Sequence, residues 1–314
     1  MRRSVHIAGI LIFLLVTSCT HKELCYDHPH VLEVDFEFVW DESQNEFPSS
    51  MSVYLFHEYG DRPARFEFTD PEGGRIRLDM GKYDAVFVNS DTRNIRIDNH
   101  TDFDSFYITT KDGTTPGNLA RYGINISNAP KAKDTDEERL AEIPETVWAT
   151  SLEEIEITEN NQKVILYPKK VTSTYHIEIR NPQNLKYINA VSGTLSSMSE
   201  GRSGKGGLLS ENRVTIPFEG LIDRESNLIT GELASFGHCP SATNTHHLVI
   251  YTVLADESWW YYTYDVTEQI HNSPDPYNIY IVLDDLPIPK PVVNGGGFKP
   301  TVGEWNSIDI EIQM

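Results

Sequence analysis

Hydrophobic and polar residues alternate with a period of two along most of the chain. In the first such run, the apolar positions are Leu32, Val34, Phe36, Phe38 and Trp40. Successive side chains of a strand point to opposite faces, so this pattern predicts a half-buried strand. Similar runs follow before residue 111, separated by turn sequences: "MSVYLFHE", "RFEFT", "RIRLD", "KYDAVFVN", "NIRI" and "SFYITT". About seven short strands at this spacing are typical of an all-β sandwich.

A second series of alternating segments occupies residues 171–284: "VTSTYHIEIR", "KYINAVSGTLSSM", "NRVTIPFE", "LITGELASF", "HHLVIYTVLA", "SWWYYTYDVT" and "YNIYIVLD". Residues 111–146, before it, are polar and punctuated by Gly and Pro, which predicts a long surface excursion. The junction between the two series is expected near Pro168, because proline interrupts strand pairing. The sequence contains no long helical pattern and no internal repeat.

The end of the chain returns to the strand pattern after the linker-like "LPIPKPVVNGGG". Its apolar positions are Trp305, Ile308, Ile310 and Ile312, which predicts a strand over residues 305–313. Such a strand can complete its own sheet or add to the sheet of another subunit. Both alternatives stay open, and the four residues are the candidate strand-donor positions.

The first eighteen residues have the shape of an export signal. Arg2 and Arg3 precede ten uncharged residues, Ile7–Val16, which are too few to span a hydrocarbon core of about 30 Å. The following Val16-Thr17-Ser18-Cys19 resembles a bacterial lipobox, which implies cleavage before Cys19 and lipid attachment to that cysteine. Several acyl chains together give stable membrane anchoring. The alternative is an ordinary secretory signal followed by a cysteine.

Composition limits the possible partners and cross-links. The formal charge is −21, and it becomes −23 when Arg2 and Arg3 leave with the signal peptide. An anionic surface repels nucleic-acid phosphates, so nucleic acid is not an expected partner. Three cysteines are too few for a disulfide scaffold, although Cys25 and Cys239 could pair in an export compartment.

Several side-chain groups could in principle carry chemistry. Cys239 and three neighbouring histidines, at 238, 246 and 247, contain metal-ligand types, but successive strand residues point to opposite faces, so ordinary histidines are expected. "GRSGKGG" at 201–207 lacks the spacing and the following helix of a phosphate-binding loop. No short catalytic signature is present, so we expect no enzyme and no metal or other cofactor.

The aromatic segment "WWYYTY" at 259–264 is the other candidate. Alternation places Trp260, Tyr262 and Tyr264 on one face of a strand. Core packing is the simpler expectation for these rings, whereas an exposed row could stack on sugars. These three residues are therefore the candidate exposed aromatics of a glycan-binding protein.

The chain resembles the Bacteroidetes fimbrillin-like lipoproteins, close to an uncharacterised family related to minor-fimbria anchor subunits. The resemblance is carried, in order, by "CTHKELCYDHPH", "VYLFHEYGD", "LDMGKYDAVFVNSD", "LYPKKVTSTYHIEIRN", "GELASFGH", "YDVTEQI", "IYIVLDD" and "GGFKPTVGEWNSIDIEI". It implies two tandem transthyretin-like β-sandwich domains and assembly through strand addition between subunits. With the patterns above, it gives a signal peptide at 1–18, a lipidated tether at 19–30, sandwiches at 31–162 and 163–290, and a linker with C-terminal strand at 291–314.

In stalk subunits of such fimbriae, a protease that cuts after a basic residue releases the first strand. This chain has no Lys or Arg between Lys22 and Arg62. We therefore expect it to keep the strand over 31–40 and to act as a terminal or basal subunit.

Together, these features predict a surface-exposed lipoprotein of the outer membrane that acts as a fimbrial anchor or accessory subunit. Its expected partners are outer-membrane lipid, through the acyl chains on Cys19, and other fimbrillin-like subunits. A surface glycan-binding lipoprotein is the alternative.

Overall fold

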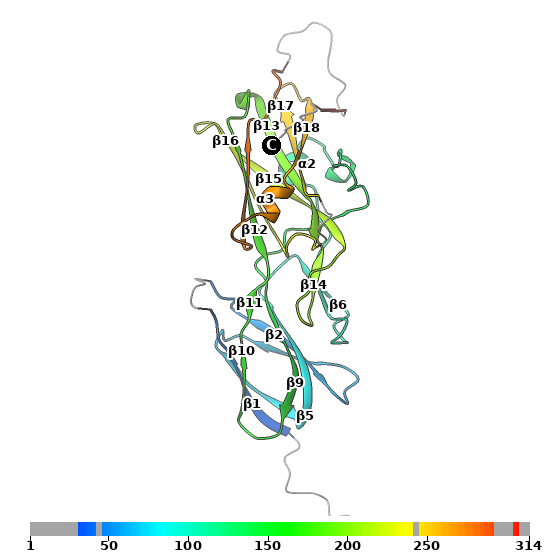
Figure 1. The fold of residues 1–314 in the computed structure, drawn as a ribbon, viewed down its shortest axis with the longest axis vertical. Helices are drawn as coiled ribbons and strands as arrows, with labels where there is room; N and C mark the ends of the chain where they lie inside the picture. Colours follow the sequence, from blue (N-terminus) through cyan, green and yellow to red (C-terminus); the bar gives the residue numbers. More distant parts are fainter. Residues whose placement is uncertain (1–30, 42–45, 241–244, 292–303, 308–314) are drawn as a thin grey trace, which may run out of the picture.

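The computed structural model describes residues 31–41, 46–240, 245–291 and 304–307, and it is elongated (Figure 1). Strands dominate these residues, and they form two regions stacked along the long axis. The all-β fold class predicted from the period-two pattern is confirmed. The division into tandem transthyretin-like domains, with limits at 31–162 and 163–290, stays a prediction. Among the described residues, no helix is long and apolar enough to cross a membrane.

The N-terminal region has a core between two facing sheets. One sheet has the order β10-β1-β4 and the other β11-β9-β5-β2-β3. Buried apolar side chains from both sheets form one cluster, including Val34 of β1, Val53 of β2 and Phe87 of β5. The strands are β1 (Val31–Phe38), β2 (Met51–His57), β3 (Ala64–Phe68), β4 (Gly73–Asp79), β5 (Gly81–Asn89), β9 (Trp148–Ile157), β10 (Gln162–Leu166) and β11 (Lys169–Lys170).

A third, small sheet covers the other face of the five-stranded sheet. It consists of β6 (Ile95–Asp98), β7 (Tyr107–Thr110) and β14 (Gly201–Ser203), in the order β14-β7-β6. Phe103, Phe106 and Ile108 from this layer pack with Tyr54 and Val86 of the five-stranded sheet. Because β14 comes from the second strand series, this layer joins the two halves of the sequence.

The C-terminal region contains a nine-stranded sheet that folds over itself. Its order is β19-β12-β16-β15-β13-β17-β18-β20, and β8 also pairs with β15. The first part of β15 pairs with β13 and its last residues, 220–223, pair with β16, so β15 joins the two layers. The strands are β8 (Arg139–Leu140), β12 (Ser173–Arg180), β13 (Ile188–Ser199), β15 (Arg213–Asp223), β16 (Leu228–Ser235), β17 (His247–Leu254), β18 (Trp259–Asp265), β19 (Asn278–Asp284) and β20 (Trp305–Ser307).

The large apolar core of this region lies between the two layers. Alternate residues of β12 (Tyr175, Ile177 and Ile179) enter it from one layer, and those of β17 (Leu248 and Ile250) enter it from the other. Short helical elements connect some of the strands: η2 (Leu185–Tyr187) precedes β13, and α3 (Thr267–His271) follows β18. The period-two pattern therefore located this core correctly.

The segment 111–146, predicted as a surface excursion, instead packs on the C-terminal region. It contains α2 (Gly117–Ala120), η1 (Ile126–Asn128) and β8. Leu119 and Ile126 are buried against Val249 and Tyr251, on the face of the sheet that points away from the large core. The segment still lies at the surface, and many of its residues are exposed. Its packing was not predicted, because its few apolar residues have no strand period and only the assembled sheet supplies the surface that they cover.

Buried Glu138 fixes the end of this segment to the sheet. Its carboxylate accepts hydrogen bonds from the Ser197 amide (2.9 Å) and the Thr215 hydroxyl (2.7 Å), and Arg213 lies 3.6 Å away. Ser197 lies at an irregularity of the β13–β15 pairing and has a φ of 60°, a left-handed conformation that is uncommon for serine. The carboxylate therefore satisfies a backbone amide that the sheet itself leaves unpaired.

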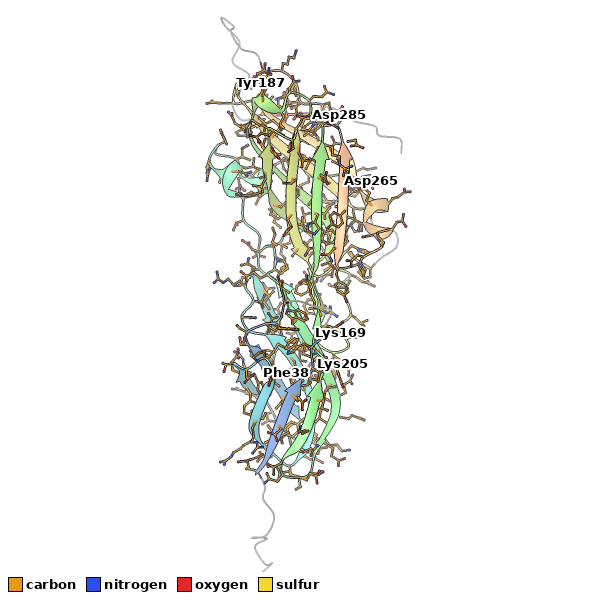
Figure 2. All side chains as sticks on the ribbon, turned by 90° about the vertical axis from the view of Figure 1, so that its left-hand side faces the viewer. Phe38, Lys169, Tyr187, Lys205, Asp265 and Asp285 are labelled. Carbon is orange, nitrogen blue, oxygen red and sulfur yellow. The ribbon has the colours of Figure 1, made fainter. Side chains whose placement is uncertain are left out.

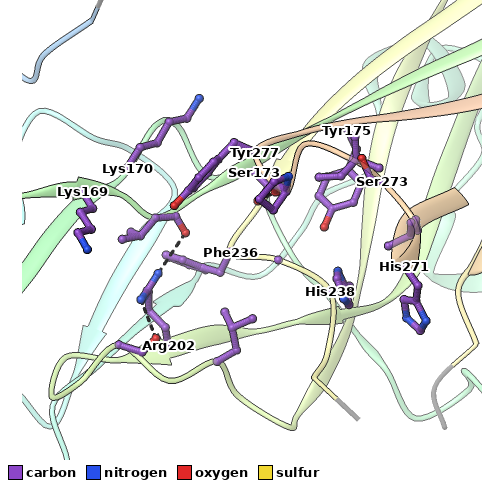
Figure 3. Close-up of a pocket in the computed structure, with 17 residues that line it drawn as sticks. Lys169, Lys170, Ser173, Tyr175, Arg202, Phe236, His238, His271, Ser273 and Tyr277 are labelled. Atoms are coloured by element: carbon purple, nitrogen blue, oxygen red, sulfur yellow. Dashed lines mark hydrogen bonds between the residues drawn. The ribbon is translucent and has the colours of Figure 1, made fainter. Parts of the chain in front are cut away.

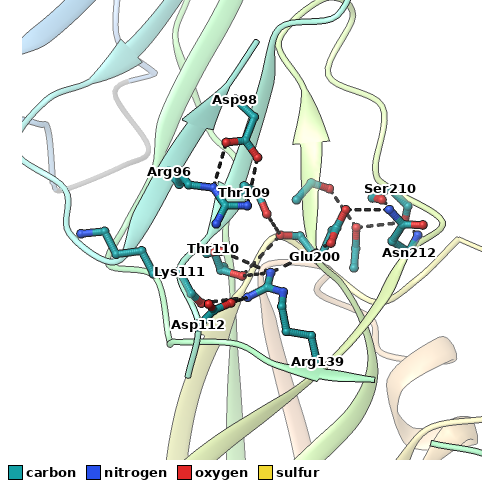
Figure 4. Close-up of polar contacts among 12 residues, drawn as sticks. Arg96, Asp98, Thr109, Thr110, Lys111, Asp112, Arg139, Glu200, Ser210 and Asn212 are labelled. Carbon is teal, nitrogen blue, oxygen red and sulfur yellow. Dashed lines mark hydrogen bonds and ion pairs between the residues drawn. The ribbon is translucent and has the colours of Figure 1, made fainter. Parts of the chain in front are cut away.

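A polar network ties together three distant segments beside this attachment (Figure 4). Arg139 donates to the carbonyls of Lys111 and Thr110 and to the carboxylate of Asp112 (3.1 Å). The carbonyl of Glu200 accepts from the Thr109 hydroxyl (2.9 Å). These bonds hold the small third sheet and the covering segment in one arrangement relative to the C-terminal region.

Candidate functional site

The described part of the predicted C-terminal strand lies in its own sheet. β20 pairs with β18 in parallel, with Trp305 opposite Trp259, and the Asn306 amide donates to the Trp259 carbonyl (3.1 Å). Among the described strands, β20 is the outermost on that side. Of the candidate strand-donor residues, Trp305 is therefore placed at the sheet edge, whereas Ile308, Ile310 and Ile312 lie outside the described residues.

Aromatic rings surround Trp305 at this edge. Its ring centroid lies 5.2 Å from that of Tyr251 and 5.5 Å from that of Trp259. Tyr251 is buried, and its hydroxyl donates to the carbonyl of Pro130 in the covering segment (2.6 Å). Trp305 itself is half-buried, so β20 adds one large side chain to a cluster that the covering segment already shields.

The face of β18 proposed as an exposed aromatic row points inward. Tyr262 and Tyr264 are buried in the large core, and Trp260 packs against it while its indole donates to the Ser258 hydroxyl. Core packing, the simpler expectation, therefore holds for Tyr262 and Tyr264, and the alternative of an exposed row is wrong for them, because the second layer of the sheet covers them. Exposed aromatic rings lie elsewhere, for example Tyr280 at 62% exposure, stacked on His176.

The cysteine predictions fall mainly on residues that the structure does not describe. Cys19, the predicted lipid acceptor, and Cys25 both lie outside the described ranges. Cys239 is buried and forms no disulfide within the described residues, and its sulfur donates to the Glu211 carbonyl (3.3 Å). Lipidation and the pairing of Cys25 with Cys239 therefore remain predictions.

The first strand, expected to be retained, is a central strand. β1 pairs with β4 on one side and in parallel with β10 on the other. Leu32, Val34, Phe36 and Phe38 are each at most 4% exposed. On the opposite face, Asp35 forms a two-pronged ion pair with Arg75 (2.7 and 3.0 Å), which lowers the pKa of Asp35.

Three histidine rings meet beside the start of β17. His246 lies within 5.0 Å of His271 and 5.6 Å of His238 between ring centroids. The ring Nδ1 of His246 lies 3.2 Å from the Ser196 carbonyl. Because a carbonyl can only accept, Nδ1 carries the proton and donates, so Nε2 of the neutral ring is left as an acceptor. Nε2 accepts from His271 Nε2 at 3.1 Å. Burial lowers the pKa of His246 to about 4.

The sequence grouped His247 with His238 and missed His271, which α3 brings in from residues further along the chain. His247 belongs to the other face of β17, as the alternation predicted. Within the described residues, no group of three His, Cys, Asp or Glu side chains is arranged to hold a metal ion.

A pocket of about 400 Å³ lies next to this histidine cluster, between β11, the loop after β14 and the start of β12 (Figure 3). Its described lining carries five basic residues and no carboxylate: Lys169, Lys170, Arg202, His238 and His271. Tyr175, Phe236 and Tyr277 supply aromatic walls. Sequence reasoning considered Arg202 only within the glycine-rich segment 201–207, and His238 only as a metal-ligand type. It did not find the pocket, because the lining comes from four separate segments between residues 169 and 279.

Comparison with known proteins gives relatives in the Bacteroidetes. The chain is 23% identical over 190 residues to the candidate fimbrium anchoring subunit Fim4B of Bacteroides ovatus, covering 60% of this chain and 51% of that protein. The chain thus spans about half the length of this curated relative. The predicted resemblance to fimbrillin-like proteins is confirmed.

Solved structures share the fold. A candidate adhesin from Bacteroides ovatus superposes with a TM-score of 0.60 at 20% identity, over 87% of this chain and 99% of that chain. The fimbrial anchor protein Mfa2 from Porphyromonas gingivalis superposes with a TM-score of 0.50 at 12% identity, over 81% and 90% of the two chains. At the level of families, the model described as "Domain of unknown function (DUF5119)" matches residues 18–219, so the chain belongs to that family.

Proposed function

We propose that this protein is a cell-surface fimbrial anchor or accessory subunit, held at the outer membrane by lipid on Cys19. The relationship to a candidate anchoring subunit and the fold shared with a fimbrial anchor protein support the proposal. The role is structural, and catalysis forms no part of it.

The observation that carries this proposal is the direction in which the chain runs along the long axis of the molecule. β1 starts at the lower end of the long axis and runs upward to Phe38, which still lies in the lower half (Figure 2). The nine-stranded sheet lies beyond it, toward the opposite end (Figure 1). Lipid on Cys19, twelve residues before Val31, would therefore attach one pole to the membrane and present the other pole outward.

Partner subunits would bind through the sheet edge at β18. β20 covers only Trp259–Tyr261 on this side, and within the described ranges no strand pairs with the outer side of Tyr262–Asp265. Such an edge exposes backbone donors and acceptors that another chain can pair with. Either the C-terminal strand at 305–313 moves to a partner, or a partner strand adds beside it.

Cell fractionation with a Cys19→Ala variant tests the anchoring. We expect the variant to leave the outer membrane, while Cys25→Ala, its matched control, stays there and still co-purifies with fimbrial subunits. Membrane retention of the Cys19→Ala protein would contradict lipid anchoring.

Deletion of residues 305–314 tests the assembly surface separately. We expect a folded, membrane-bound protein that no longer co-purifies with fimbrial subunits. Unchanged co-purification would rule out the C-terminal strand as a contact, and loss of folding would show that the strand belongs to its own sheet.

A further inference from the structure

The pocket beside the histidine cluster stands out because its charge opposes that of the rest of the chain. The protein has 47 acidic and 26 basic residues outside histidine. Yet Lys169, Lys170 and Arg202 line this one pocket without a carboxylate among the described lining residues. Asp275 lies near Lys170, but its carboxylate already accepts from the Tyr277 amide and the Asn278 side chain.

Arg202 keeps unused donors inside the pocket. Its guanidinium donates to the carbonyls of Val171 (3.5 Å) and Gly207 (2.6 Å), contacts drawn in Figure 3. A guanidinium has five N–H groups, so three stay available, and in the described part of the chain no carboxylate acts on the charge of Arg202. A half-buried arginine fixed by backbone carbonyls is a pre-oriented receptor for a carboxylate or another oxyanion.

Tyr175 provides the second observation. It is fully buried, and within the described residues its hydroxyl makes no hydrogen bond of standard geometry, with the Ser235 hydroxyl as its nearest side-chain neighbour. The neighbouring Ser235 hydroxyl already donates to and accepts from Gly237. In Figure 3 the Tyr175 hydroxyl points toward His238. Burial raises the pKa of Tyr175, so the hydroxyl remains protonated at neutral pH and can donate to a ligand.

From this geometry we propose that the pocket binds a small carboxylate ligand carried on a compact, partly apolar body. Arg202 and the Tyr175 hydroxyl bind the carboxylate, and Phe236, Leu209 and Ile279 pack against the body. The volume of about 400 Å³ suits a ligand of the size of a monosaccharide or an aromatic acid. The lysines of β11 add long-range attraction at the rim. This site does not depend on the proposed fimbrial role.

Isothermal titration of the purified full-length protein with two matched pairs tests the charge requirement. Glucuronate is compared with glucose, and benzoate with benzamide, and inorganic phosphate serves as a third anion. We expect at least one carboxylate to bind saturably and about tenfold or more tighter than its neutral counterpart. The pair that shows the difference identifies a sugar body or an aromatic body. Equal binding within both pairs, or tighter binding of phosphate than of either carboxylate, would overturn the proposal.

Two matched pairs of variants then locate the binding site. Tyr175→Phe removes only this hydroxyl, so we expect intact folding and binding weakened about tenfold. Its control is Tyr262→Phe, which removes another buried hydroxyl outside the pocket and should leave binding unchanged. Lys169→Gln should weaken binding about threefold at low salt, whereas Lys82→Gln, with the same charge change on β5, should not. Unchanged binding in Tyr175→Phe would exclude this pocket as the site.

Discussion

The apolar surfaces of the two regions are covered by different kinds of segment. The N-terminal region is sealed by its own first strand, since β1 lies between two other strands and buries four apolar side chains. The C-terminal region takes its cover from residues 117–141, which precede it in the chain, and its last described strand is only three residues long. The first described strand is thus built into a core, whereas the last described strand lies at a sheet edge.

This difference indicates which end can exchange with a partner. Removing β1 would expose the core and leave β4 and β10 without their common neighbour. Removing β20 would uncover one half-buried tryptophan and three residues of pairing. Among the described residues, releasing β20 therefore costs much less free energy than releasing β1. The proposed exchange at the C-terminal edge agrees with the absence of Lys and Arg between Lys22 and Arg62.

The strongest test of the comparison is Phe36→Ala in β1. Phe36 is 2% exposed and packs against the rings of Phe68 and Phe87. We expect the free energy of unfolding to fall by about 3–5 kcal/mol, measured by chemical denaturation. Val31→Ala, at an exposed position of the same strand, should change it by less than about 0.5 kcal/mol. A small effect of Phe36→Ala would show that β1 does not seal the core.

Glu138→Ala tests how the covering segment, residues 117–141, is fixed to the C-terminal region. The substitution leaves the Ser197 amide, the Thr215 hydroxyl and Arg213 without their shared acceptor. We expect a loss of about 3 kcal/mol in the free energy of unfolding. Glu137→Ala, at the exposed neighbouring position, is the control and should be nearly neutral. Equal effects of the two variants would mean that the cover is not fixed by this carboxylate.

The histidine cluster makes the stability of the C-terminal region depend on pH. Burial, above all, lowers the pKa of His246 to about 4, below the value of about 6.5 expected for the unfolded chain. Between these two pH values the unfolded state binds more protons than the folded state. The contribution of His246 to the free energy of unfolding is therefore fully present above pH 6.5. It is lost as the pH falls toward 4, by up to about 1.4 kcal/mol per pH unit.

Thermal unfolding of His246→Gln from pH 4 to 7 measures this contribution. The pH dependence of Tm should be shallower in the variant than in the parent protein. His100→Gln, at an exposed position, should keep the parent slope. Parallel curves for His246→Gln and the parent would exclude His246 as the titrating group.

Trp305→Ala should have the smallest effect on stability. The ring is half-buried at the sheet edge, so we expect the free energy of unfolding to fall by about 1 kcal/mol. If β20 is part of the contact, the amount of fimbrial subunit that co-purifies should fall strongly. Ser307→Ala, the control, should leave both the free energy of unfolding and the co-purification unchanged. A loss of several kcal/mol would show that β20 is as firmly held as β1, which would contradict the comparison.

Much of the fold was predictable because strands with one buried face leave a period-two record in the sequence. The alternation of Leu32, Val34, Phe36 and Phe38 gave the inward face of β1 correctly. The same rule paired Tyr262 with Tyr264, yet it could not decide whether that face is covered, since an inward and an outward row of aromatic rings have the same period.

The sequence alone determined the all-β class, the faces of the strands, the acidic charge and the family resemblance, because these depend on local order and on composition. Only the tertiary structure decided which distant segments and side chains contact one another. It buried the covering segment on the sheet, brought His271 to His246, and lined one pocket with Lys169, Arg202 and Tyr175. These contacts join residues far apart in the chain, and their free energy comes from packing and hydrogen bonds that exist only once the sheets have formed.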